Sequence, residues 1–146
     1  NDYQMILGTI LAGIQGTHHV KSNREDGDGY PDYSITPKPG YGTVGFIIEL
    51  KHLKRNQRPA SLDELAAALK EAAQNDALKQ INDRHYSEAF AEASHVKQIL
   101  KIGIAFTGKK LVCAYTLSTA AIEVDEGEVK TLFSYGLGDS PETPSS

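Results

Sequence analysis

The chain has 146 residues, a length that fits one domain with room for a hydrophobic core. Its formal net charge is −4. No apolar run approaches the roughly 18 residues that cross a bilayer, which argues against a membrane-spanning helix. The single cysteine, Cys113, excludes an internal disulfide and a multi-cysteine zinc site, and its apolar surroundings predict a buried core residue.

The acidic groups are concentrated toward the C-terminal end. Residues 120–146 hold six acids and one lysine, which is −5, so the rest of the chain carries +1 and leaves room for a local basic face. The chain begins at Asn1 without a cationic segment followed by an apolar one. We therefore expect no signal peptide and infer a piece of a larger multidomain protein.

The first half of the chain predicts one helix and three strands. Residues 2–15 place apolar side chains at helical spacing. Strands are expected over 18–23, 31–37 and 43–51, with the last the most apolar. Because short turns rich in glycine and proline join them, the three strands predict an antiparallel meander.

The second half predicts a long helix over 61–83, where Ser61 and Glu64 match a capping box. Its apolar stripe consists of positions 62, 65, 66, 69, 73, 77 and 81. A shorter helix is expected over 87–94, followed by two strands around a turn at Gly108. The order is α-βββ-α-ββ, which indicates an α/β fold with a domain over 1–119 and an acidic tail or linker over 120–146.

Three charged residues lie on two consecutive predicted strands. Glu49 and Lys51 share one face of their strand, because side chains alternate, and Asp32 opens the strand before it. Antiparallel pairing would bring the two acids close together, where they repel unless a cation joins them. Mg²⁺ prefers such oxygens, and Lys51 would act on water or on a phosphate beside it. The alternative is a surface Glu–Lys pair worth at most about 1 kcal/mol.

Gln80 falls on the apolar stripe of the long helix, where the pattern asks for an apolar side chain. A buried amide needs hydrogen-bond partners, and a polar site between helix and sheet would supply them. A glutamine that reaches solvent near the helix end fits the pattern equally well.

Lys54 and Arg55 lie in a basic run directly after Lys51. They form either a solvated loop or a contact to a nucleic-acid backbone.

Asp32 and "ELK" (residues 49–51) match the D…(D/E)xK pattern, here with Pro31 before the aspartate. Together with "KSNRE", "ALKQINDRHY" and "KIGIAFTGK", the chain over residues 3–115 resembles the PD-(D/E)XK nuclease-like domains that accompany AAA-ATPase-like proteins and occur in toxins of intracellular bacteria. The resemblance implies a restriction-endonuclease-like core, in which helices flank a central mixed sheet.

The resemblance also implies roles for individual residues. Asp32, Glu49 and the carbonyl of Leu50 would hold Mg²⁺, or Mn²⁺ in its place. Lys51 would be the catalytic lysine, supported by Gln80. The remaining site residues that it implies are Ser22, Arg24 and Tyr86. Many members of the superfamily carry a further acid on the first helix, where this chain offers only Asp2; Glu25 follows the first strand.

These features predict a metal-dependent nuclease that acts on DNA with low sequence specificity, located in the cytoplasm or delivered to a host cell as an effector. A second hypothesis is an inactive nuclease-like domain that binds protein or nucleic acid in a larger toxin. A third is a structural appendage of an ATPase.

Overall fold

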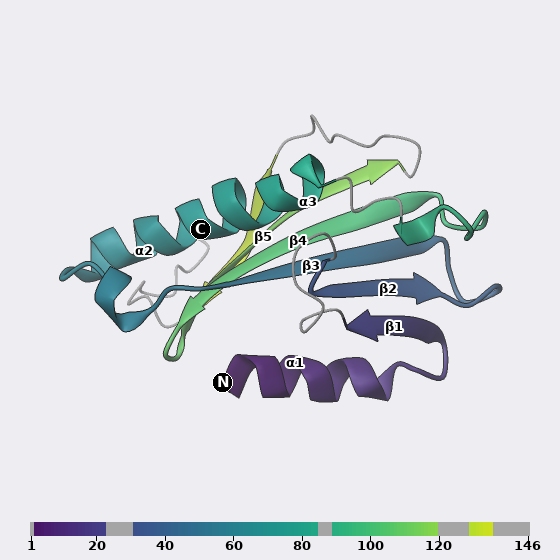
Figure 1. Cartoon of the computed structure of the whole chain (residues 1–146), viewed down its shortest axis with the longest axis horizontal. Coiled ribbons are helices and arrows are strands. Elements are labelled where there is room, and N and C mark those ends of the chain that lie inside the picture. The colour runs from purple at the N-terminus through teal and green to yellow at the C-terminus, as the bar shows by residue number, and fades with distance from the viewer. Residues whose placement is uncertain (1, 23–30, 85–88, 120–128, 136–146) are drawn as a thin grey trace, which may run out of the picture.

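Six strands form one sheet in chain order, with helices on both faces (Figure 1). The computed structural model describes residues 2–22, 31–84, 89–119 and 129–135. The strands are β1 (His18–Ser22), β2 (Tyr33–Pro37), β3 (Val44–His52), β4 (Gln98–Thr107), β5 (Lys110–Thr119) and β6 (Lys130–Tyr135). The described helices are α1 (Asp2–Gly13), η1 (Arg55–Gln57), α2 (Leu62–Glu71), η2 (Ala72–Leu78) and α3 (Lys79–Asp83).

The strand pairings confirm the predicted mixed sheet. β1, β2 and β3 pair antiparallel as the expected meander. The helices α2, η2 and α3 follow one another without a break and are called the long helical segment. β3 and β4 pair parallel, because this segment carries the chain back to the side of the sheet where β3 began. β4 and β5 are antiparallel around Gly108, whose φ of 56° lies in the left-handed region that a glycine adopts easily.

Two segments differ from the sequence-based expectation. β6 pairs with β5 inside the range 120–146, so part of the expected tail belongs to the sheet. The helix expected over 87–94 is wrong for its described part, since residues 89 and 90 form a 3₁₀ turn and no helix follows before β4. The domain boundary at residue 119 stays a prediction.

The sheet has a different apolar core on each face. On one face, Leu11 of α1 packs with Tyr33, Ile35 and Ile48. On the other face, the long helical segment packs against the sheet through a larger cluster that includes Ile47 and several helix residues. None of the described helices combines the length and the apolar character that crossing a membrane requires.

The long helical segment begins as predicted, since the Ser61 side chain accepts a hydrogen bond from the backbone N–H of Glu64 at 3.1 Å. Leu62 departs from the predicted stripe, because it is 41% exposed. The buried row recurs every four residues and consists of Leu65, Leu69, Ala73, Ala77 and Ile81.

The row stays against the sheet because the helix changes its winding. An α-helix has 3.6 residues per turn, so a four-residue repeat would gradually rotate away from the sheet. In η2 the chain is a π-helix, whose hydrogen bonds run from residue i to i+5, and its wider turns offset this rotation. The π segment therefore sets the face on which the next residues, including Gln80, emerge.

Candidate functional site

Two acids meet where β2 begins and β3 ends. Tyr33 pairs with Ile48 across these strands, which places Asp32 beside Glu49. The Asp32 Oδ2 atom accepts a hydrogen bond from the backbone N–H of Leu50 at 2.8 Å. The peptide group of β3 thus fixes the orientation of the Asp32 carboxylate, and the structure brings together the two acids that the sequence pattern singled out.

Glu49 is buried, with 3% of its surface exposed, and its Oε2 atom has no hydrogen-bond partner among the described residues. Burial, followed by a hydrogen bond with Asp32 and the Asp32 charge, raises the pKa of Glu49 to about 8. The charges of Lys51 and Arg84 act against these effects. The site therefore favours either a proton or a cation between the two acids.

These acids fit a hard divalent cation. An unpartnered carboxylate oxygen next to a second carboxylate supplies the oxygen ligands that Mg²⁺ takes from proteins, and Mg²⁺ keeps several waters of its own. Among the described residues, no group of three or more histidine, cysteine or acidic side chains is placed to hold a metal. The donor set shown for the described chain is thus an acid pair beside the backbone of Leu50.

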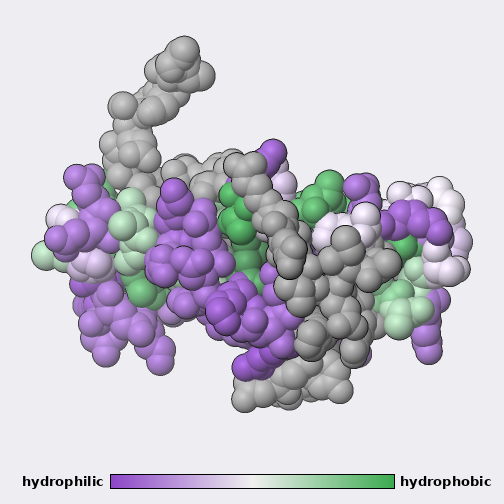
Figure 2. Space-filling model, turned by 90° about the horizontal axis from the view of Figure 1, so that it is seen from above, coloured by the Kyte–Doolittle hydropathy of each residue, from purple (hydrophilic) through white to green (hydrophobic). Residues whose placement is uncertain are grey.

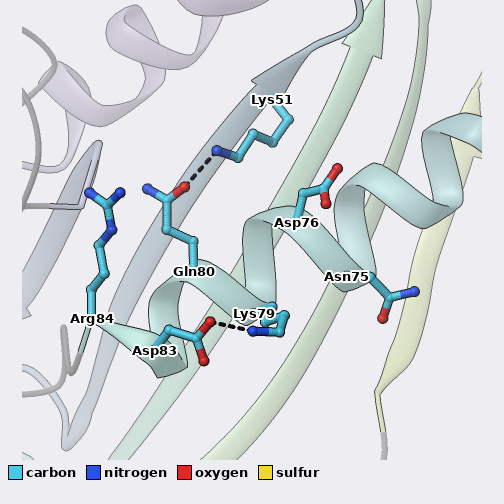
Figure 3. A pocket seen from close by; sticks show the side chains of 7 residues that line it. All are labelled: Lys51, Asn75, Asp76, Lys79, Gln80, Asp83 and Arg84. Carbon is cyan, nitrogen blue, oxygen red and sulfur yellow. Dashed lines mark hydrogen bonds and ion pairs between the residues drawn. The ribbon is translucent and has the colours of Figure 1, made fainter.

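Lys51 lies on the same strand face as Glu49 and contacts the long helical segment. Its Nζ atom donates a hydrogen bond of 2.6 Å to Oε1 of Gln80 (Figure 3). Gln80 is half-buried, so of its two interpretations the structure favours the one in which it serves a polar site between helix and sheet.

A close approach of helix to sheet makes this contact possible. Gly103 of β4 is the register partner of Glu49. A Cβ atom on Gly103 would lie 2.4 Å from the carbonyl oxygen of Ala73 and 2.9 Å from the Cβ of Ala77. Glycine at this position therefore lets η2 lie directly on the sheet next to the acid pair.

A buried lysine also ties α3 to the sheet. Lys101 of β4 is 1% exposed, and its Nζ atom donates a hydrogen bond of 2.8 Å to Oδ1 of Asn82. Lys101 lies among apolar residues on one side of β4, and this break in the apolar pattern could have identified it from the sequence as a buried polar residue. Its contact lies two residues beyond Gln80 and helps to hold α3 over the site.

A pocket of about 400 Å³ opens beside Lys51 along the long helical segment (Figure 3). Its lining consists of Lys51, Asn75, Asp76, Lys79, Gln80, Asp83 and Arg84. Asp32 and Glu49 do not line it. Figure 2 shows the molecule from above and has hydrophilic side chains over its left half and its centre, with hydrophobic side chains among them.

The other predicted site residues divide into three groups. Ser22 ends β1 opposite Tyr33, one residue from Asp32, and is exposed. Lys54 and Arg55 are exposed at the start of η1, just beyond the end of β3. The last group, Arg24, Tyr86 and the acid Glu25, lies outside the described residues.

Arg84 is a pocket residue that the sequence interpretation did not select. It follows Gln80 by four positions, so the helical repeat that identified Gln80 was also a signal for Arg84. Asp2, the one acid offered by the first helix, begins α1.

Comparison with protein families assigns most of the chain to a known family. The model of the family described as the PD-(D/E)XK nuclease superfamily matches residues 1–116, which include Asp32, Glu49, Lys51 and Gln80. Searches of the curated proteins and of the solved structures found no match.

Proposed function

Because the chain belongs to the PD-(D/E)XK nuclease superfamily, we propose that it is a metal-dependent nuclease that hydrolyses phosphodiester bonds of DNA with low sequence specificity. The observation that supports the proposal most directly is the buried Glu49 carboxylate. Its Oε2 atom has no partner among the described residues, and it lies next to Asp32 and on the same face as Lys51. An unpartnered buried acid is costly to the fold, so its presence beside a second acid points to a cation.

In this mechanism, Asp32, Glu49 and the Leu50 carbonyl would hold the ion. Mg²⁺, or Mn²⁺ in its place, would supply positive charge at the phosphate and lower the pKa of a water molecule. The hydrogen bond from the Leu50 N–H fixes the orientation of the Asp32 carboxylate, which would help it to bind the ion. Two side chains and one backbone carbonyl would thus bind the metal ion.

Lys51 and Gln80 act on the substrate side of the acid pair. The Lys51 ammonium has three N–H donors, and Gln80 accepts one of them, which directs the others. A directed ammonium orients the attacking water and stabilises the negative charge that develops on the phosphate. Gln80 is therefore a positioning residue in this proposal, and Lys51 is a catalytic residue.

The test is cleavage of supercoiled plasmid DNA, followed on a gel. We expect nicking with Mg²⁺ or Mn²⁺ and none after chelation, because the acid pair alone repels the phosphate. Lys51→Ala should lower the rate by about 100-fold or more. Lys70→Ala removes an exposed lysine of α2 and should leave the rate unchanged. Cleavage that continues in chelator, or equal rates for the two variants, would contradict the mechanism.

A second candidate function is an inactive nuclease-like domain that binds protein or nucleic acid in a larger protein. The observation in its favour is that the described residues offer two acids and no third metal ligand of the His, Cys or acidic kind. Mn²⁺ affinity separates the two candidates. If Asp32→Ala leaves both the Mn²⁺ affinity and the melting temperature unchanged, the acids are part of a scaffold and this second function is favoured.

A further inference from the structure

Arg84 occupies the same pocket as Lys51 but comes from the opposite side of the sheet–helix interface. It is the C-cap residue of α3, and its backbone N–H donates a hydrogen bond of 3.1 Å to the carbonyl of Gln80. Arg84 is exposed, and its side chain lines the pocket.

The side chains of Arg84 and Gln80 extend in the same direction from α3 (Figure 3). Gln80 lies between Arg84 and Lys51 in this view, and its Oε1 atom bonds to Lys51. Two cations therefore flank one amide at the edge of the pocket. This arrangement offers an anion two positive groups from two different elements, β3 and α3.

The lining of the pocket is weakly cationic, because Lys51, Lys79 and Arg84 lie there against Asp76 and Asp83. The formal charge of this lining is +1, and the two ionised acids Asp32 and Glu49 bring the total to −1. One bound dication would bring it to +1, which favours the rise in negative charge on a phosphodiester during hydrolysis.

We propose that Arg84 binds the phosphate group that is cleaved, on the other side of Gln80 from Lys51. The proposal rests on the nuclease function proposed above. In the reaction, the oxygen of water forms a bond to phosphorus and the bond to the leaving sugar oxygen breaks. One water proton ends on that leaving oxygen, and the other is released from the new phosphate monoester.

Negative charge increases on the two non-bridging oxygens while the bonds change. A guanidinium presents a planar fork of N–H donors that matches two such oxygens, whereas an ammonium acts as a point charge. Arg84 would thus be a further catalytic residue. Lysine at this position would keep the charge and lose the fork.

Arg84→Gln, Arg84→Lys and Lys79→Gln form a matched series. Lys79 lines the same pocket, but its Nζ atom is paired with Asp83 at the exposed surface. Lys79→Gln therefore removes the same charge without removing a proposed phosphate ligand. We expect Arg84→Gln to lower kcat/KM for DNA cleavage by about 100-fold, the cost of losing one charge-stabilising donor. Arg84→Lys should recover part of the rate, and Lys79→Gln should stay close to wild type.

Two further measurements separate substrate binding from support of the fold. Mn²⁺ affinity of Arg84→Gln should equal or exceed that of wild type, because a positive charge near the acids is removed. The melting temperature should not fall, since the backbone cap remains. Weaker Mn²⁺ binding by Arg84→Gln would overturn the proposal in favour of a structural role. A melting temperature low enough for unfolding to account for the lost rate would do the same.

DNA binding in Ca²⁺, measured by fluorescence anisotropy of a labelled duplex, distinguishes the two proposals. Wild-type protein that binds but never cleaves would overturn the nuclease function, while weaker binding by Arg84→Gln than by Lys79→Gln would still support Arg84 as a phosphate ligand. Equal cleavage and binding by Arg84→Gln and Lys79→Gln would overturn the role of Arg84 alone. Wild-type protein that neither cleaves nor binds would overturn both.

Discussion

The two faces of β3 perform different tasks. Phe46, Ile48 and Leu50 point to the α1 side and pack into an apolar cluster. On the other face, Ile47 packs under the long helical segment, and Glu49 and Lys51 follow it toward the end of the strand. One strand thus carries a plain core on one side and the acid–lysine pair on the other.

The helices on the two faces explain this difference. α1 contributes apolar side chains to the described cluster of its face. The long helical segment ends instead in polar residues that meet polar residues of the sheet, Gln80 with Lys51 and Asn82 with Lys101. The amines of Lys51 and Lys101 can lie on this face because the opposing helix supplies matching hydrogen-bond partners. The site is therefore a property of the helix–sheet interface, and three predictions test this conclusion.

The largest effect on stability is expected where a helix approaches the sheet most closely, and the comparison is between η2 at Gly103 and α1 at Gly8. Gly103→Ala places a Cβ against the carbonyl of Ala73, so we expect unfolding free energy to fall by about 1–3 kcal/mol. Gly8→Ala in α1 meets nothing within 4 Å and should stabilise the protein by up to about 1 kcal/mol. Urea denaturation measures both changes.

A shifted η2 would also move Gln80, so Gly103→Ala should lower the cleavage rate in conditions where the variant is folded. Gly8→Ala should leave the rate unchanged. Loss of stability without loss of rate would show that η2 does not set the position of Gln80.

The second prediction concerns the pH dependence of stability in metal-free protein. Burial and the neighbouring Asp32 raise the pKa of Glu49 from 4.5 to about 8, so the folded protein holds this proton more tightly than the unfolded chain. The contribution of this proton to stability is complete below pH 4.5 and is lost as the pH rises toward 8. Glu49→Gln should flatten this part of the profile in urea denaturation at several pH values.

Ile48→Val provides the control on the other face of β3. It removes a methylene group without a titrating group, so it should lower stability by about 1 kcal/mol to a similar extent at every pH. Mn²⁺ should oppose the loss of wild-type stability at high pH, because the ion binds the ionised acids. Parallel pH profiles for wild type and Glu49→Gln would show that the acid pair is not the source of the slope.

The smallest effect is expected outside the interface, at the end of β3. Lys54 and Arg55 are exposed there, next to the sheet end at which Leu53 N–H bonds to the carbonyl of Phe106 at 2.9 Å. If both contact DNA phosphates, the double change to glutamine should weaken DNA binding a few-fold and reduce the slope of log affinity against log salt by about 2. Lys97→Gln, at the opposite end of β4, is the control and should keep the wild-type slope.

Much of the fold follows from local patterns in the sequence. The apolar run along residues 43–51 and the cap at Ser61 are read from neighbouring residues, and the structure confirms the strand, the cap and the antiparallel meander. β6 was missed because its short run lies among acids, which resemble a linker. The turn at residues 89 and 90 was missed because tertiary contacts override the helix propensity of the residues there.

By itself, the sequence determined which strand face carries Glu49 and Lys51, because side chains alternate in any strand. Only the tertiary structure decided their partners, since the contacts of Asp32 with Leu50 and of Lys51 with Gln80 join residues far apart in the chain. Strand register, the close approach at Gly103 and the π turn of η2 set those distances. None of these three follows from local periodicity, because each depends on how two elements pack against one another.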